Sequence, residues 1–101
     1  MRIGYHTTLV LQAMAGGARY GFDIMRVTGL ASGTVYPILR RLEASGMVES
    51  EWEPDGPAHE ERRPARRYYE PTAAGRAALA ESLERLRAQR GLLELPAEEG
   101  G

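Results

Sequence analysis

The chain contains no cysteine and no lysine, and the first absence narrows what it can do. Without cysteine there are no disulfide frameworks, no cysteine-based zinc sites and no thiol nucleophiles. The two histidines, His6 and His59, are far apart and do not have the spacing of metal ligands. A glycine-rich phosphate loop of the G-x-x-x-x-G-K type is also missing. An enzyme is therefore the weakest class for this chain, and we expect no cofactor and no bound metal.

Long apolar segments are missing as well, since no run of about 18 or more apolar residues occurs. The N-terminal sequence MRIGYHTTLVLQAM lacks the apolar core and the small-residue cleavage site of a signal peptide. We therefore expect a cytoplasmic protein that does not contact membranes. The length of 101 residues leaves room for one domain with a modest core.

Charge is balanced in total but uneven along the chain. All 13 basic residues are arginine, and 14 acidic residues bring the formal net charge to -1, which argues against a protein that coats nucleic acid non-specifically. The segment RRPARR (62–67) nevertheless holds four arginines, and Arg40 and Arg41 form another pair. Acidic residues gather in ESEWEPD and in the C-terminal ELPAEEGG. The sequence thus favours a local positive surface on a nearly neutral protein.

Helical spacing of apolar residues predicts two short helices near the N-terminus. The first covers TTLVLQAMA (7–15) and ends at a pair of glycines. The second lies in YGFDIMRV (20–27), where Tyr20, Ile24 and Val27 share one face, and it closes at Thr28 and Gly29.

A third helix is predicted within SGTVYPILRRLEASG (32–46). Its apolar stripe consists of Val35, Ile38, Leu39 and Leu42. Gly46 permits a left-handed C-terminal cap, and Met47 supplies the apolar contact that accompanies such a cap. Pro37 fits because it lies near the helix start, whether Ser32 or Thr34 is the N-cap. The tight TGLA connection makes the second and third helices a helix-turn-helix candidate.

Two strand-like segments follow, MVESEWE (47–53) and RRYYEPT (66–72), separated by a stretch rich in proline, glycine and charge. A hairpin with a long polar loop after a helix-turn-helix is the element order of a winged helix. We therefore predict a mainly α protein with a small β-hairpin (α+β). Its winged helix-turn-helix domain covers residues 1–71, with the wing at about 53–66.

Residues 72–93 are predicted to form a C-terminal helix with Thr72 as N-cap. Four leucines follow a heptad seam, in which Arg76 and Arg90 take the remaining positions: Leu79, Leu83, Leu86 and Leu93. Such a stripe suits either packing within the monomer or a dimer helix, and we prefer the dimer helix. Glu81 and Arg85 are spaced as a favourable i, i+4 ion pair. The acidic tail, residues 94–101, is expected to be disordered.

The face of the third helix opposite its apolar stripe is unusual in shape. It is centred on Gly33, Pro37, Arg40 and Ala44. Small residues around one arginine allow close approach to the DNA major groove, where guanine O6 and N7 accept a bidentate arginine. The hydroxyls of Ser32, Thr34 and Tyr36 suit phosphates, as do the free N–H groups at the helix start. A solvated helix face is the competing interpretation of Arg40 and Arg41.

Three segments, in this order and spacing, resemble the PadR-like winged-helix transcriptional regulators of prokaryotes. They are YGFDI (20–24), SGTVYPILRRLEASGMVES (32–50) and RPARRYYEPTAAG (63–75). The segments are similar to the start of the family's second helix, to its recognition helix with the following strand, and to the basic end of its wing with the start of the last helix. Three departures are Pro71, where the family usually has an aliphatic residue, Arg62, where a glycine is common, and RPARR, which is one residue longer than usual. Trp52 is similar to a family tryptophan, and we expect it in the core.

The resemblance implies a homodimeric repressor that binds palindromic promoter sites in double-stranded DNA, pairs through its terminal helices and responds to a small aromatic effector. The candidate DNA-contacting residues are Tyr20, Ser32, Gly33, Thr34, Tyr36, Pro37, Arg40, Arg41, Arg63, Arg66 and Arg67. The candidate dimer-interface residues are Leu9, Leu79, Leu83, Leu86 and Leu93.

Two other functions remain open from the sequence. A winged-helix module that binds a protein partner and no DNA would suit the acidic ESEWEPDG segment and the net charge of -1. A small ligand carrier would use a cavity at a dimer interface.

Overall fold

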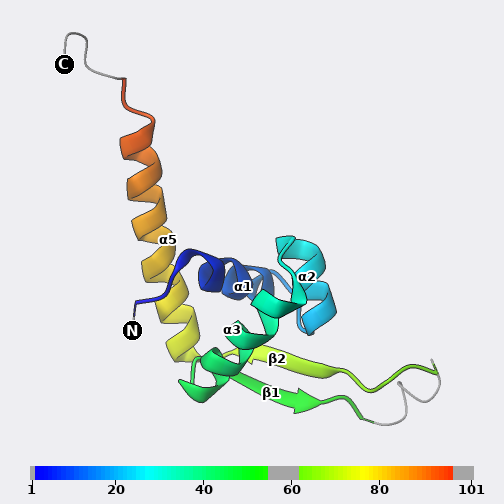
Figure 1. Cartoon of the computed structure of the whole chain (residues 1–101). Helices are drawn as coiled ribbons and strands as arrows, with labels where there is room; N and C mark the ends of the chain where they lie inside the picture. Colours follow the sequence, from blue (N-terminus) through cyan, green and yellow to red (C-terminus); the bar gives the residue numbers. More distant parts are fainter. Residues whose placement is uncertain (1, 55–61, 97–101) are drawn as a thin grey trace.

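The computed structural model describes residues 2–54 and 62–96. Within these ranges it contains four helices and a two-stranded antiparallel hairpin (Figure 1). In chain order the elements are α1 (Tyr5–Ala15), α2 (Gly21–Thr28), α3 (Ser32–Ala44), β1 (Val48–Trp52), β2 (Arg67–Pro71) and α5 (Ala73–Leu93). The predicted winged-helix order is confirmed. The middle of the predicted wing, residues 55–61, and the end of the predicted tail, residues 97–101, lie outside the described residues.

The core lies where α1, α2 and α3 meet one face of the hairpin and the first half of α5. The four apolar residues predicted for α3 are each exposed by 3% or less: Val35, Ile38, Leu39 and Leu42. Val27 was expected on the buried face of α2, but its side chain is 53% exposed. The expectation was wrong because α2 turns Gly21 and Ile24 toward the core, and Val27 lies on the opposite edge of that stripe.

The start of α3 differs from both predicted alternatives. Ala31 is the N-cap, and its carbonyl accepts the N–H of Val35 at 3.0 Å, so neither Ser32 nor Thr34 caps the helix. Pro37 is therefore the sixth helical residue and removes the N–H that would otherwise bond to the Gly33 carbonyl. Gly33 is exposed, so water can satisfy this carbonyl and the cost of the proline stays below that of a buried break.

The end of α3 is as predicted. Gly46 has a φ of 77°, the left-handed conformation, and Met47 behind it is buried. The N–H of Met47 donates to the Leu42 carbonyl at 2.9 Å, which satisfies one of the last carbonyls of the helix. This cap turns the chain directly into β1.

The hairpin has two different faces because side chains alternate along each strand. Its α3 face carries Val48, Ser50 and Trp52, and its outer face carries Glu49 and Glu51. The register pairs Glu49 with Glu70, Ser50 with Tyr69 and Trp52 with Arg67. On the other side of β2 the chain before α2 runs alongside, since the Tyr69 N–H donates to the Arg19 carbonyl at 2.7 Å. The hairpin is therefore fixed to the helical body along β2, and β1 forms its free edge.

The start of α5 is packed tightly against the end of α3. Thr72 is the N-cap, as predicted: its Oγ1 accepts the Gly75 N–H at 3.2 Å and donates to the Gly46 carbonyl at 2.7 Å. A Cβ placed on Gly75 would lie 2.0 Å from the Met47 carbonyl oxygen, so only glycine fits this approach. The first turns of α5 are thus joined firmly to the segment that links α3 to β1.

Polar contacts also join α5 to the N-terminal segment. The hydroxyls of Thr8 and Ser82 are 2.6 Å apart and both residues are buried, while Arg85 donates to the Ile3 carbonyl at 3.1 Å. The predicted pair of Glu81 and Arg85 is present at 3.3 Å. Beyond these contacts the second half of α5 extends away from the body of the molecule (Figure 1). No helix in the described ranges is long and apolar enough to span a membrane.

Candidate nucleic-acid interface

The exposed face of α3 is present as a continuous surface. Gly33 and Arg40 are exposed, Pro37 is half-buried, and the small Ala44 ends the row. The side chains of Arg40 and Arg41 form no hydrogen bond or ion pair with any residue in the described ranges. Glu43, the acidic residue of α3, bonds instead to Ser50 and Arg67 of the hairpin. The guanidinium groups of Arg40 and Arg41 therefore remain available to an external partner.

The N-terminal end of α3 suits an anion. Its N-cap is Ala31, which provides no capping side chain, so the first N–H groups of the helix are not covered by a side-chain acceptor. Ser32 and Gly33 beside them are exposed. Helix N-termini of this kind bind phosphate through backbone N–H groups and the helix dipole.

Tyr36 lies at the junction of α2 and α3. A Cβ on Gly21 would come within 2.4 to 2.6 Å of the hydroxyl end of the Tyr36 ring, so the ring packs directly on the α2 backbone. Tyr36 is still 39% exposed, on the hairpin side of the α3 face. Tyr36 thus fixes the helix-turn-helix geometry and borders the surface that carries Arg40.

The base of the wing is held by a buried carboxylate. Glu53, only 6% exposed, accepts two hydrogen bonds from Arg63, at 2.7 and 2.9 Å, and one from the Tyr68 hydroxyl at 2.8 Å. The donors of Arg63 lower the pKa of Glu53 to about 2; burial opposes this shift, and the Tyr68 hydroxyl supports it. Glu53 is therefore ionised at neutral pH and binds the end of β1 to the chain that returns from the wing.

Arg66 and Arg67, the other two candidate DNA-contacting residues of the wing, lie against aromatic rings. The guanidinium of Arg66 is 4.2 Å from the centroid of the Tyr20 ring, which in turn meets the Tyr68 ring edge-on at 5.9 Å. Arg67 is 3.2 Å from a Glu43 carboxylate oxygen and 5.2 Å from the centroid of the Trp52 ring. Arg66 forms no ion pair with any described carboxylate, unlike Arg67. The structure thus separates Arg66 from its two neighbours, which sequence reasoning treated alike.

Sequence reasoning also misplaced Trp52. Its side chain is 62% exposed, so the expectation that it belongs to the core was wrong. The buried end of the hairpin is the one at Val48, and Trp52 lies four residues further along β1, beyond the part that the helices cover. Strand alternation in VESEW indicates that Trp52 lies on the same face as Val48. It does not indicate how far along the strand the helices cover that face.

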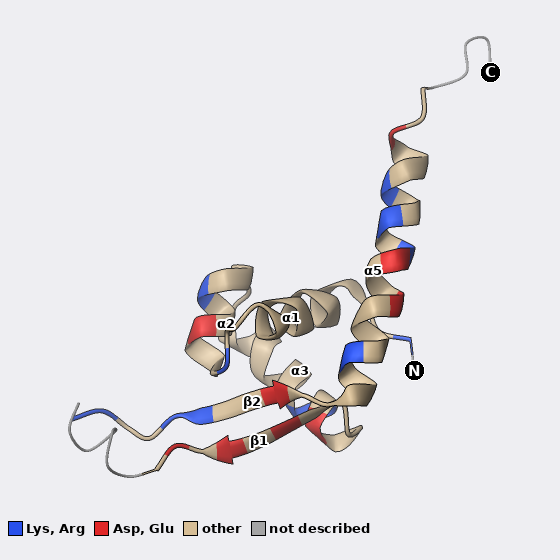
Figure 2. Cartoon of the chain, turned by 180° about the vertical axis from the view of Figure 1, so that it is seen from behind, with Lys and Arg blue, Asp and Glu red and all other residues tan. Residues whose placement is uncertain are grey.

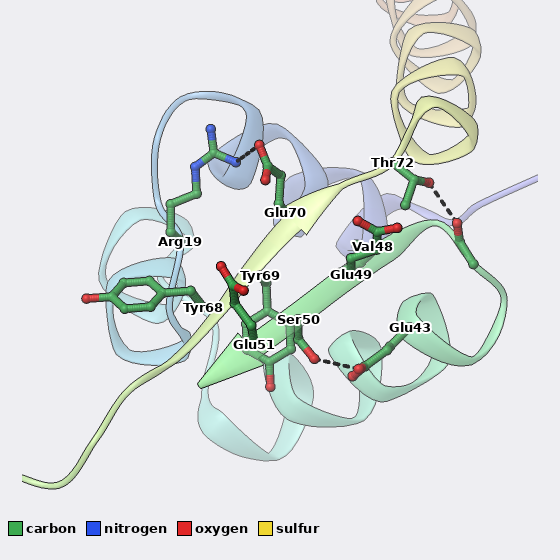
Figure 3. A pocket seen from close by; sticks show the side chains of 11 residues that line it. Arg19, Glu43, Val48, Glu49, Ser50, Glu51, Tyr68, Tyr69, Glu70 and Thr72 are labelled. Atoms are coloured by element: carbon green, nitrogen blue, oxygen red, sulfur yellow. Dashed lines mark hydrogen bonds and ion pairs between the residues drawn. The ribbon is translucent and has the colours of Figure 1, made fainter. Parts of the chain in front are cut away.

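The outer face of the hairpin is acidic. A hollow of 860 Å³ lies against the hairpin, with residues of both strands in its lining, which includes Glu43, Glu49, Glu51, Glu70 and Arg19 (Figure 3). Arg19 and Glu70 approach to 3.7 Å. Within residues 2–54 and 62–96 no three acidic or histidine side chains converge on a point that could hold a metal ion.

Basic and acidic side chains therefore occupy different parts of the hairpin. Seen from behind, both strands carry acidic positions, and arginines mark the start of β2 and the segment before it (Figure 2). Phosphate would be repelled by the outer face and attracted at the end near the wing.

The five candidate dimer residues divide into two groups. Leu79 is 6% exposed and belongs to the core of the monomer, and Leu83 packs against that core. Leu9 and Leu86 are half-buried, and Leu93 is 85% exposed. The seam thus serves the monomer core in the first half of α5, and its second half offers apolar side chains to solvent.

Helix-turn-helix, hairpin and C-terminal helix together define a winged-helix protein, and comparison with known proteins specifies its class. The model of the PadR-like family of transcriptional regulators matches residues 10–81. The chain belongs to this family; it is a transcriptional regulator and not an enzyme. The comparison with curated proteins gives no match.

Solved structures share the fold. A PadR family transcription regulator from Clostridium difficile superposes with a TM-score of 0.77 at 22% identity, covering 89% of this chain and 95% of that one. A PadR-like transcription factor from Bacteroides fragilis gives 0.71 at 22% identity, with coverages of 86% and 84%. BpsR of Bordetella bronchiseptica, whose DNA binding is regulated by 6-hydroxynicotinic acid, gives 0.71 at 20% identity, with coverages of 94% and 69%.

Proposed function

We propose that the protein is a homodimeric repressor that binds a palindromic promoter site through α3 and the wing. The observation that carries this proposal is the exposed face of α3, where Arg40 stands among small residues without a partner in the described ranges. A helix of this shape fits the major groove, and a free guanidinium can bind guanine O6 and N7. Phosphates would lie at the uncapped start of α3.

In this proposal the wing arginines divide their roles. Arg66 lies on the Tyr20 ring and pairs with no carboxylate within residues 2–54 and 62–96, so its charge is available to the DNA backbone. Arg63 is held by Glu53 and Arg67 by Glu43, so these two residues first position the wing and the hairpin. Their charges are partly neutralised and contribute less to the attraction of phosphate.

The homodimer is inferred from the second half of α5. Leu92 and Leu93 are 69% and 85% exposed at the end of a helix that leaves the body of the monomer, and Leu95, just beyond that end, is 65% exposed. A second copy packed along this half would remove them from water, together with Leu86. Two-fold symmetry of such a dimer explains why a palindromic site is expected. Leu79 is not part of the proposed interface, because it already lies in the monomer core.

A small aromatic effector is proposed from the likeness to BpsR of Bordetella bronchiseptica, whose DNA binding is regulated by 6-hydroxynicotinic acid. The hollow beside β1 is a poor site for such a molecule, because its lining carries four carboxylates, which repel an acidic ligand. We therefore place the effector between the two copies, beside the exposed leucines of α5.

Selection of genomic fragments with the purified protein, followed by sequencing, tests the proposal and supplies the operator. With that operator, Arg40→Ala should cost about 1 to 3 kcal/mol of binding free energy and relax the sequence preference. Arg40→Lys keeps the charge, so it should relax the preference but retain the salt dependence. Arg66→Ala should weaken all duplexes alike and reduce the slope of affinity against salt by about one.

Arg87→Ala is the matched control, since it removes an exposed arginine from α5, away from α3 and the hairpin. Its affinity for DNA should equal that of the wild type. Failure of the wild type to bind any duplex in a salt-dependent way would contradict the proposed function.

A protein-binding role is the second candidate, and the acidic outer face of the hairpin favours it. Glu49, Glu51 and Glu70 lie there and would attract a basic partner surface. If this is the function, the variant that combines Arg40→Ala and Arg66→Ala should bind the protein partner with unchanged affinity and regulate transcription as the wild type does.

A further inference from the structure

Trp52 is a large aromatic side chain for which the proposed function has no role. It is the single tryptophan of the chain and is 62% exposed. Tryptophan has a large apolar surface and one N–H donor, which usually finds a partner in a folded or bound state. No hydrogen-bond partner for this N–H is present among the described residues, and the guanidinium of Arg67 lies 5.2 Å from the centroid of the ring.

Strand alternation places Trp52 on the same side of the hairpin as α3. Val48, four residues before it, is buried in the core, and Ser50, two residues before it, bonds to Glu43 of α3. Trp52 therefore lies on the α3 face of the hairpin, beyond the part of that face that α3 covers.

A short series of contacts holds the indole ring in that place. Glu43 accepts a hydrogen bond from Arg67 at 3.2 Å, and the same guanidinium lies 5.2 Å from the centroid of the Trp52 ring. Glu43 is three residues after Arg40 on α3, and it lies at the hairpin edge of the exposed face. The ring is thus fixed beside the surface that we assign to the major groove.

We propose that Trp52 contacts the sugar–phosphate backbone of duplex DNA next to the groove that α3 enters. The indole N–H would donate to a phosphate oxygen, and the apolar ring would cover a deoxyribose. Arg67 and Glu43 act as positioning residues. A polyanion is the favoured partner because the Arg67 cation lies against the ring. This inference rests on the proposed function.

The single tryptophan makes a direct test feasible. A fluorescein-labelled duplex of mixed sequence is titrated with the protein at low salt, where backbone contacts alone give binding. Anisotropy of the label reports binding, and tryptophan emission with acrylamide quenching reports on Trp52. We expect the emission to change and acrylamide to quench it less when the duplex is bound.

Two variants measure the contribution to affinity. Trp52→Ala should weaken binding about tenfold on every duplex, the effect of losing a hydrogen bond to a charged group. Trp52→Phe keeps an aromatic ring without the N–H, so it should lie between Trp52→Ala and the wild type. Tyr5→Ala is the matched control, because it removes another exposed aromatic side chain, 60% exposed, at the start of α1. Equal urea midpoints establish that all variants fold.

The positioning role has a separate readout. Arg67→Met removes the cation from the ring, so the tryptophan emission of the free protein should change before DNA is added. An unchanged emission of the free variant would contradict that role.

The outcomes separate the two proposals. A bound duplex that leaves the tryptophan emission and quenching unchanged, with normal affinity of Trp52→Ala, overturns the inference and leaves the proposed function intact. Absence of duplex binding by the wild type removes both.

Discussion

Replacing Gly75 by alanine should destabilise the protein, although the same change normally stabilises a helix. Alanine is favoured over glycine in a helix interior by about 1 kcal/mol. At Gly75, however, the new Cβ would lie 2.0 Å from the Met47 carbonyl oxygen. Non-bonded heavy atoms prefer separations of about 3.5 to 4.0 Å, so α5 and the start of β1 would have to move apart by more than 1 Å. Overpacking of this kind costs about 1 to 3 kcal/mol, which exceeds the gain in helix propensity.

Urea unfolding followed by far-ultraviolet circular dichroism measures the effect at one fixed protein concentration. Gly91→Ala is the matched control, because Gly91 lies in the same helix and a Cβ there would meet nothing within 4 Å. This control should raise the free energy of unfolding by roughly 0.5 to 1 kcal/mol. If Gly75→Ala were as stable as the wild type, or more stable, the close approach of α5 to Met47 would be refuted.

Two further predictions concern the wing and the proposed dimer. Glu53 is held at a pKa of about 2, below its unfolded value, so its charge contributes stability above about pH 4.5 that is lost as the pH falls toward 2. Urea midpoints measured across this pH range should therefore fall more steeply for the wild type than for Glu53→Gln, and parallel curves would contradict the buried ion pair. Leu93→Glu alters a residue that is exposed in the monomer, so sedimentation equilibrium should show weaker self-association with unchanged monomer folding; an unaltered dimer would exclude this end of α5 from the interface. Leu79→Ala should instead lower the stability of the fold by about 2 to 5 kcal/mol.

The elements that were predicted correctly are those whose determinants lie within their own sequence. In α3 the apolar spacing, the left-handed glycine and the buried Met47 are all local features, and each is observed. The start of α3 was missed because Ala31 is not a typical capping residue, and the position of an N-cap without a capping side chain depends on the preceding turn. Val27 was assigned to the core from its helical spacing and Trp52 from its likeness to a family tryptophan. Tertiary packing, which neither signal contains, decides how much of a helix or strand the other elements cover.

The wing shows the limit of local reasoning most clearly. The segment RRPARR contains no acid, which favoured a free basic surface. Its carboxylate partners come from elsewhere in the chain: Glu53 is ten residues before Arg63, and Glu43 is 24 residues before Arg67. Arg62 has a φ of 54°, a left-handed conformation that glycine adopts more readily than any other residue.

The acidic outer face of the hairpin restricts how a duplex can approach the molecule. The net charge of -1 provides almost no overall attraction to DNA, so the separation of charge must set the orientation. Glu49, Glu51 and Glu70 would repel phosphate on the outer face, whereas Arg40 on α3 and Arg66 at the wing would attract it. In the proposed complex, repulsion by the outer face disfavours most orientations once the DNA is within a Debye length, about 8 Å at physiological salt. The favoured encounter orientation is therefore the one in which α3 already faces the groove.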